Sequence, residues 1–315
     1  MPEKEHLHCL LCGDLNPRSF GLRFAPQGGN SVHAGETMNK NMPTLKILVD
    51  NSAAEGLASE HGLSVWVEAG GKRILFDAGQ GAALEQNAGR MGINLSTADA
   101  FVLSHGHYDH TGAIDFVLQE NPEVPVYAHP EVLKTRYSIY PDKASKDISM
   151  PPEERLLIEN LPDSQLHWVK EPVQIAPDVH LTGPIPRNHP LEDTGGPFFL
   201  DPDKAKPDPI TDDMAMWIET PRGLLVVCGC CHSGVVNTLD HIQKASGTTR
   251  IWGIVGGLHL KSASQERLQA TTEYLRDLAP EFLVPCHCTG ETAIDYFKQN
   301  LASIQINPGF AGLEL

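Results

Sequence analysis

The chain has 315 residues, of which 41% are hydrophobic, and its 24 basic and 40 acidic side chains give a formal net charge of −16. This length and apolar content allow a substantial buried core, in one large domain or two ordinary ones, while the acidic balance argues against binding to nucleic acid or to anionic membrane surfaces. No apolar run approaches the roughly 20 residues that cross a bilayer, and the start of the chain lacks the plan of a secretion signal. We therefore expect a cytoplasmic protein without a nucleic-acid or membrane partner; the sequence does not indicate its oligomeric state.

Residues 1–43 are polar and weakly periodic. We interpret them as an N-terminal extension of unknown role that precedes one folded domain over residues 44–315. Within the extension, Cys9 and Cys12 follow two histidines, a spacing that fits either a structural zinc site or two reduced thiols. The chain has seven cysteines, an odd number that fits no tidy disulfide framework, so we expect reduced thiols or neighbours of a metal.

Hydrophobic patterning from residue 45 onward predicts strands and helices in close succession. The predicted strands cover residues 45–49, 63–67, 73–76, 100–103, 125–128, 179–181, 214–219, 224–228, 251–255 and 282–284. The predicted helices cover residues 82–91, 113–119, 235–245, 264–278 and 293–300. A hairpin turns at Gly70-Gly71, and the charged, proline-rich segment 141–162 is predicted to be irregular and peripheral. Hairpins mixed with strand–helix units imply an α/β (α+β) fold of layered sheets faced by helices.

The run SHGHYDHTG, directly after one of these strands, packs three imidazoles and a carboxylate into six positions. Such ligands suit zinc first, with manganese or iron as alternatives, and a strand-to-helix loop holds them rigidly while leaving room for a substrate. We predict that His105 and His107 face one ion, while Asp109 and His110 face a second ion about 3.5–4 Å away. The alternative is a solvated loop that chelates metal only adventitiously.

Three later histidines each follow an apolar strand closely, namely His232, His259 and His287. Because the carboxyl ends of such strands share one edge of a sheet, these side chains are expected to converge with the first motif. We predict that His232 and His287 are metal ligands, and that His259 either coordinates metal or holds a substrate oxygen. For Cys230 and Cys231 we favour close packing over coordination, because histidine and aspartate already supply enough ligands.

Other polar residues at strand ends have two interpretations each. Asp212 and Asp213 either brace a metal-binding imidazole or form an ordinary turn. The Glu60-His61 and Asp77 segments either support the ligands or cap elements. The stretch of residues 183–209, which is rich in proline and glycine, is either a lid or a solvated loop; as a lid it offers Arg187 for a substrate phosphate and Phe198-Phe199 for a flat ring.

Taken together, these motifs resemble the metallo-β-lactamase superfamily. The finer resemblance, to the branch typified by dihydropterin-ribofuranosylaminobenzene-phosphate synthase and its bacterial relatives, lies in LVDN (48–51), EHGLS (60–64), LFDAGQ (75–80), GCCHSGVVN (229–237), GGLHL (256–260) and HCTG (287–290). The resemblance implies a four-layered αββα sandwich as the catalytic domain, with two divalent metal ions. The Pro-Gly-His loop of many superfamily hydrolases is absent near His189, which makes His189 a doubtful ligand, and His107 stands where a glutamate would indicate redox chemistry.

Two activities remain open at this point, and both use a small-molecule substrate. The first is hydrolysis of a phosphorylated or ester substrate through a metal-bound hydroxide, with Asp109 and His259 as catalytic residues. The second, implied by the resemblance, is transfer, in which an aromatic acceptor displaces diphosphate from a pterinylmethyl donor. A noncatalytic, metal-stabilised binding protein would need a site closed by protein ligands, and the glycines around these motifs favour an open site.

Overall fold

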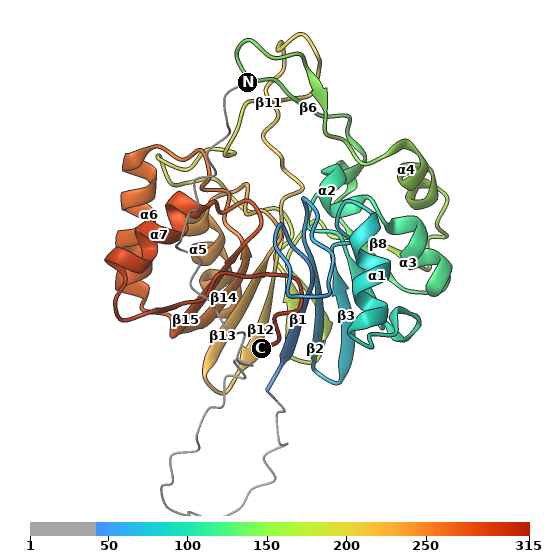
Figure 1. The fold of residues 1–315 in the computed structure, drawn as a ribbon, viewed down its shortest axis with the longest axis horizontal. Coiled ribbons are helices and arrows are strands. Elements are labelled where there is room, and N and C mark those ends of the chain that lie inside the picture. Colours follow the sequence, from blue (N-terminus) through green and yellow to red (C-terminus); the bar gives the residue numbers. More distant parts are fainter. Residues whose placement is uncertain (1–41) are drawn as a thin grey trace, which may run out of the picture.

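The computed structural model describes residues 42–315. Two β-sheets pack face to face, and helices cover the outer face of each (Figure 1). The first sheet has the strand order β1–β2–β3–β4–β5–β8, formed by Thr44–Val49, Ser64–Ala69, Lys72–Phe76, Ala100–Val102, Val126–Ala128 and Leu166–Trp168. The second has the order β16–β15–β14–β13–β12–β10–β9, formed by Gln305–Ile306, Phe282–Cys286, Ile251–Gly257, Gly223–Cys228, Ala215–Thr220, Val179–Leu181 and Val173–Ala176.

Helices form the two outer layers (Figure 1). Those packed on the first sheet are α1 (Ala82–Arg90), α3 (Ile114–Glu120) and α4 (Pro152–Glu159). Those packed on the second are α5 (Val235–Ser246), α6 (Gln265–Leu278) and α7 (Glu291–Asn300). Three short turns complete the helical elements, namely η1 (Leu95–Thr97), α2 (Tyr108–Thr111) and η2 (Pro130–Leu133). The predicted four-layered αββα sandwich is confirmed.

The central core lies between the two sheets. Alternate residues of β1 and β2, such as Ile47, Val65 and Val67, are fully buried there and share one cluster with Leu225 and Val227 of β13. This is the period of two expected when one face of each strand packs on the core. At about 1.5–3 kcal/mol for each large aliphatic side chain removed from water, this layer is what holds the two halves of the sandwich together.

Local sequence explains several boundaries. The hairpin β2–β3 turns at Gly70 and Gly71, whose positive φ angles of 58° and 72° suit a two-residue turn that only glycine adopts without strain. Helix α6 begins after Ser264, whose side chain accepts a hydrogen bond from the Arg267 amide. Helix α5 ends at Gly247 in the left-handed conformation.

Parallel strands determine where functional side chains gather. Strands β3, β4, β5 and β8 run parallel in the first sheet, and β13, β14, β15 and β16 run parallel in the second. The carboxyl ends of β4, β13, β14 and β15 therefore open toward one edge of the sandwich, where ligands usually bind in such sheets.

One expectation about the fold is wrong. Residues 141–162 are peripheral, as expected, but they are not irregular, because they contain β7 (Lys146–Asp147) and helix α4. The prolines do not prevent a helix here, because Pro152 occupies the first helical position, where its missing N–H costs nothing. Strand β7 pairs with β6 (Tyr137–Ser138), which pairs with β11 (Phe198–Phe199), so a small third sheet assembles from distant segments.

Strands β6, β7, β8, β9, β11 and β16 and the short turns were not expected from the sequence, because each has only two to four residues or lacks alternation. Apart from its last two residues, the N-terminal extension, with its Cys9 and Cys12 pair, lies outside the described residues. No helix within residues 42–315 is both long and apolar enough to cross a bilayer.

Candidate metal centre

The histidine-rich loop begins where β4 ends and continues into the single turn α2. Close packing fixes its path, since a Cβ on Gly106 would lie 2.2 Å from the Val132 carbonyl oxygen. His105 and His110 are fully buried, and His107 and Asp109 are 5% and 7% exposed. Four polar side chains are thus held inside the protein, which is costly unless they bind one another or a ligand.

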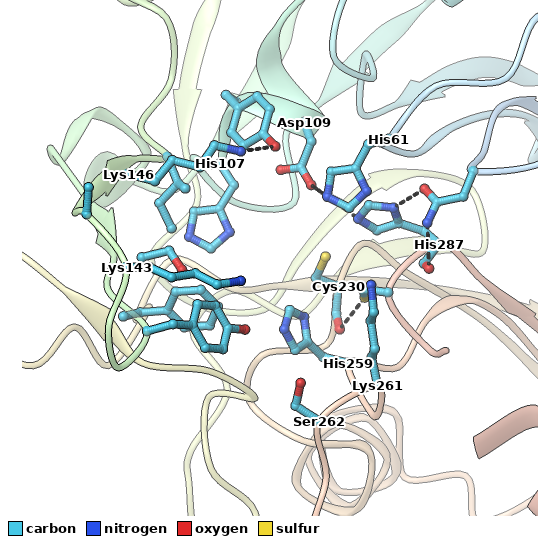
Figure 2. A pocket seen from close by; sticks show the side chains of 18 residues that line it. His61, His107, Asp109, Lys143, Lys146, Cys230, His259, Lys261, Ser262 and His287 are labelled. Carbon is cyan, nitrogen blue, oxygen red and sulfur yellow. Dashed lines mark hydrogen bonds and ion pairs between the residues drawn. The ribbon is translucent and has the colours of Figure 1, made fainter. Parts of the chain in front are cut away.

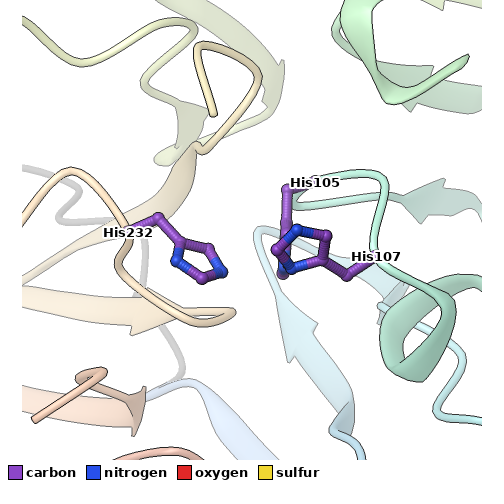
Figure 3. A group of neighbouring side chains, drawn as sticks. All are labelled: His105, His107 and His232. Carbon is purple, nitrogen blue, oxygen red and sulfur yellow. The ribbon is translucent and has the colours of Figure 1, made fainter. Parts of the chain in front are cut away.

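Three imidazoles form the first ligand group, contributed by both halves of the sandwich (Figure 3). One nitrogen each from His105, His107 and His232 lies within 4.8 Å of the others. Burial, followed by the charges of neighbouring cationic groups, holds the pKa of all three well below the usual range. They are therefore neutral and carry lone pairs, as metal ligation requires.

Two nitrogens of this group are available to bind a metal ion. Nε2 of His107 and Nε2 of His232 are buried and accept or donate no hydrogen bond within the described part of the chain. An unpaired buried polar atom costs about 1–3 kcal/mol. The donor set, three neutral imidazoles with two unpaired nitrogens, fits a divalent metal ion.

A second ligand group lies beside the first. Cys230 Sγ is 3.1 Å from Nε2 of His110, and it belongs to one group with His105 and His110 and to another with His287 and Cys288. The carboxylate of Asp109 joins through its Oδ2, which lies 3.3 Å from His287 Nε2. A thiolate, a carboxylate and imidazoles together suit a soft or borderline ion such as zinc.

Four of the five ligand imidazoles are oriented through the nitrogen that faces away from the centre, whereas Nδ1 of His107 contacts Nε2 of His105 (3.0 Å). The four contacts are His105 Nδ1 with Ser104 Oγ (2.9 Å), His110 Nδ1 with Asp77 Oδ2 (2.7 Å), His232 Nδ1 with the Thr194 carbonyl (2.8 Å) and His287 Nδ1 with Asn51 Oδ1 (2.8 Å). The Asp77 segment thus supports a ligand rather than only capping an element. Although burial opposes it, the Asp77 carboxylate raises the pKa of His110 to about 9.

Asp109 is kept ionised. Burial alone would raise its pKa, but hydrogen bonds from His287 and His61 hold the pKa well below the usual range. His61 is about half exposed and places Nε2 3.1 Å from Asp109 Oδ2. Its neighbour Glu60 has a different role, accepting hydrogen bonds from the amides of Gln80, Gly81 and Ala83 at the start of α1.

A buried cation fixes the backbone of the loop. Arg136 is fully buried and paired with Asp208 (2.7 Å) and Asp212, whose Oδ2 also accepts the Gly106 amide (2.8 Å). Asp213 likewise accepts the Ser233 amide (2.7 Å). Asp212 and Asp213 therefore each bind a backbone amide in a loop that carries metal ligands. The sequence had suggested either contact with an imidazole or an ordinary turn.

The ligand groups open into a cavity of about 360 Å³ (Figure 2). His107, Asp109, Cys230, His259 and His287 are among the residues that line it. The remaining lining side chains come largely from the small third sheet and from the segment after β14.

All six predicted ligands, His105, His107, Asp109, His110, His232 and His287, take part in these groups. His259 also lines the cavity, with its ring centroid 4.2 Å from that of His232 and its Nδ1 buried without a partner in residues 42–315. His189 belongs to none of the groups found within that range.

The position of Arg187 does not match the phosphate-binding role predicted for it. Its two terminal nitrogens donate to the carbonyl oxygens of His232 (2.5 Å), Pro209 (2.5 Å) and Ile210 (3.3 Å). Arg187 is not among the lining residues of the cavity, whereas Phe198 of the predicted lid is. The Arg187 guanidinium thus donates hydrogen bonds to backbone carbonyl oxygens behind His232. From sequence alone, an arginine with this structural role cannot be distinguished from one that binds substrate.

Sequence reasoning also passed over several side chains. Cys230 was interpreted as packing, and His61 was not separated from Glu60. Three cavity lysines, Lys143, Lys146 and Lys261, carried no motif, because only the fold brings their segments to the site. The one available signal was the position of Cys230 after a strand, two residues before His232.

Comparison with known proteins agrees with this architecture. A model of the metallo-β-lactamase superfamily matches residues 60–287. The chain is 31% identical over 253 residues, 76% of its length and 85% of the relative's, to 7,8-dihydropterin-6-methyl-4-(β-D-ribofuranosyl)-aminobenzene-5′-phosphate synthase of Methanocaldococcus jannaschii. It is 32% identical to an uncharacterised protein of the same organism, with coverage of 81% of this chain and 94% of that one.

Among solved structures, that of Tm1679, a metal-dependent hydrolase of the β-lactamase superfamily, is similar with a TM-score of 0.73 and 29% identity, over 87% of this chain and 98% of that one. The αββα sandwich and the histidine-rich centre at its edge thus define a metallo-β-lactamase fold. The chain belongs to the metallo-β-lactamase superfamily, and the curated relative within it is a pterin-related synthase.

Proposed function

We propose that residues 44–315 are a metal-dependent hydrolase domain that acts on a small phosphorylated or ester substrate. One divalent ion would be held by His105, His107 and His232. A second would be held by Asp109, His110 and His287, with Cys230 as an additional ligand. The observation that carries the proposal is the adjacency of the two ligand groups beside one cavity, which His107, Asp109, Cys230 and His287 line.

Zinc is the ion we expect, because a thiolate joins the imidazoles; manganese and iron are the alternatives. When bound, two such ions supply an activated water and neutralise charge that develops on the substrate.

The chain's own residues then position the reactants. Asp109 stays ionised. Its Oδ2 accepts hydrogen bonds from Nε2 of His61 and Nε2 of His287. Its Oδ1 has no hydrogen-bond partner in the described range and is available to orient a water. His259 is placed to hold a substrate oxygen through its unpaired Nδ1. Phe198 lies over His107 and His259, at centroid distances of 5.4 and 5.8 Å, and excludes water from that side.

The second candidate function is transfer of the kind that the name of the methanogen relative indicates. The aromatic cavity wall favours it, because a ring system bound between Phe198 and Tyr108 would shield the reacting carbon from water. The test is diphosphate release from a dihydropterin-methyl diphosphate by the metal-loaded protein, with and without a ribofuranosyl-aniline phosphate acceptor.

Release without the acceptor supports hydrolysis, and release only with the acceptor supports transfer. Elemental analysis under metal-replete conditions tests the centre itself. Fewer than one metal per chain, with no change in His107→Ala, would overturn the proposal.

A further inference from the structure

Three lysines line the cavity, two on one side and the third beside His259 and Cys230 (Figure 2). Lys143 and Lys146 come from the β6–β7 hairpin, and Lys261 follows β14 (Figure 2). Asp109 is the one carboxylate among the lining residues, and it is already paired with two histidines. In a chain with 40 acidic against 24 basic residues, three lysines to one aspartate reverses the overall balance at this location.

Within residues 42–315, no carboxylate forms an ion pair with these lysines. Neither Lys143 nor Lys261 forms an ion pair with a carboxylate in residues 42–315, whereas Lys46, Lys72 and Lys134 each do. Lys146 donates to the Tyr108 hydroxyl oxygen (2.8 Å) and lies 4.4 Å from the centre of that ring. Lys143 lies 5.6 Å from the ring centre of Tyr140. The aromatic rings thus position ammonium groups without cancelling their charge.

We propose that this lysine group, Lys143, Lys146 and Lys261, binds a second anionic group of the substrate, a phosphate or phosphonate-like dianion, remote from the bond at the metal centre. The cavity is lined by ammonium groups, aromatic rings and metal ligands. This combination of groups suits a flat, ring-bearing compound that carries two anions. The inference rests on the proposed function, which places one end of the substrate at the ligand groups.

Positive charge along the cavity has a physical advantage in an acidic protein. A net charge of −16 repels a dianionic substrate at long range, and lysines that line the cavity offset that repulsion locally. Arg187, the cation that the sequence suggested for this purpose, is engaged with backbone carbonyls. The lysine group can therefore bind the substrate anion that the sequence analysis assigned to Arg187.

The test compares two stable probes by isothermal titration calorimetry on the metal-loaded full chain. Phenylphosphonate carries one anion, and 1,4-phenylenebisphosphonate carries a second on the opposite side of the ring. We expect the bisphosphonate to bind at least about tenfold more tightly, since each exposed ammonium that contacts the dianion contributes about a fivefold change. Lys143→Met/Lys146→Met should remove most of this preference, and Lys261→Met part of it.

Lys244→Met, on the exposed end of α5, is the matched control and should leave both affinities unchanged. Phenylphosphonate affinity should change little in any lysine variant. Equal binding of the two probes, or a preference that survives in the double variant, would overturn the proposal while leaving the metal centre intact. Lysine-dependent binding of the bisphosphonate without measurable binding of phenylphosphonate would instead support the lysine group and contradict the proposed role of the metal centre.

Discussion

Asp77→Asn is the most direct perturbation of the centre that leaves every proposed ligand in place. The Asp77 carboxylate is fully buried and accepts three hydrogen bonds of 2.7 Å, from the Ser104 amide, the Ser104 hydroxyl and Nδ1 of His110. In the neutral imidazole that binds metal, this contact keeps the proton on Nδ1 and directs the lone pair of Nε2 toward the centre, where Cys230 Sγ lies 3.1 Å away; the same carboxylate raises the pKa of His110 to about 9. An asparagine has nearly the same shape but only one acceptor oxygen.

The expected loss follows from that geometry. If the asparagine oxygen keeps the Ser104 amide, its NH₂ group faces Nδ1 of His110 and moves the imidazole proton to Nε2, where it opposes coordination. Removing such a supporting carboxylate typically costs 10–100-fold in metal affinity, equivalent to about 1.4–2.7 kcal/mol. The remaining mismatch should cost about 1–3 kcal/mol of unfolding free energy.

Zinc affinity is measured by competition with a chromophoric chelator, and unfolding by urea titration of the same samples. Asp99→Asn is the matched control, because Asp99 accepts from the Arg73 amide and pairs with Lys72 on the surface. Ser104→Ala should give a smaller loss than Asp77→Asn. Native zinc affinity in a folded Asp77→Asn variant would refute the idea that Asp77 orients His110 for metal binding.

Three further results are expected. With cobalt in place of zinc, Cys230→Ser should abolish a near-ultraviolet thiolate-to-metal charge-transfer band that Cys231→Ser retains, and an unchanged band would exclude Cys230 as a ligand. Arg136→Met should lower the unfolding free energy by about 3–5 kcal/mol in urea titrations, because two buried carboxylates lose their partner. Burial, aided by the charge of Asp115, raises the pKa of Glu154 to about 7, so the protonated form stabilises the fold below pH 4.5 and this contribution is lost as pH rises through 7. Glu154→Gln should therefore gain about 1–2 kcal/mol at pH 8 and almost nothing at pH 5, and equal effects at both pH values would contradict the assignment.

The sequence located the elements that carry the centre because those elements are simple. Each ligand-bearing strand is a continuous apolar run, as expected for parallel strands buried on both faces. Four ligands within six positions, at residues 105–110, cannot be mistaken for surface composition. The convergence of His232 and His287 with this loop followed from the single rule that parallel strands share their carboxyl edge.

The side chains that surround the ligands could not be predicted in the same way. Whether the sulfur of Cys230 faces the metal or the core depends on backbone packing at Gly229 and Gly257, where a Cβ would approach neighbouring atoms within 2.1 and 2.5 Å. The lysine group depends on a hairpin whose strands have two residues each and pair with a segment some sixty positions away. Such short strands carry too little alternation to be recognised locally.

The centre also joins the two halves of the sandwich. The first half contributes His105, His107, Asp109 and His110, and the second contributes Cys230, His232 and His287. Nε2 of His107 and Nε2 of His232 are buried without a hydrogen-bond partner in the described structure, and leaving them unsatisfied would cost free energy. A metal ion that satisfies those atoms would bind a preorganised site, and its binding free energy would add to the stability of the folded chain. Substitution of either histidine should therefore change stability and metal affinity together.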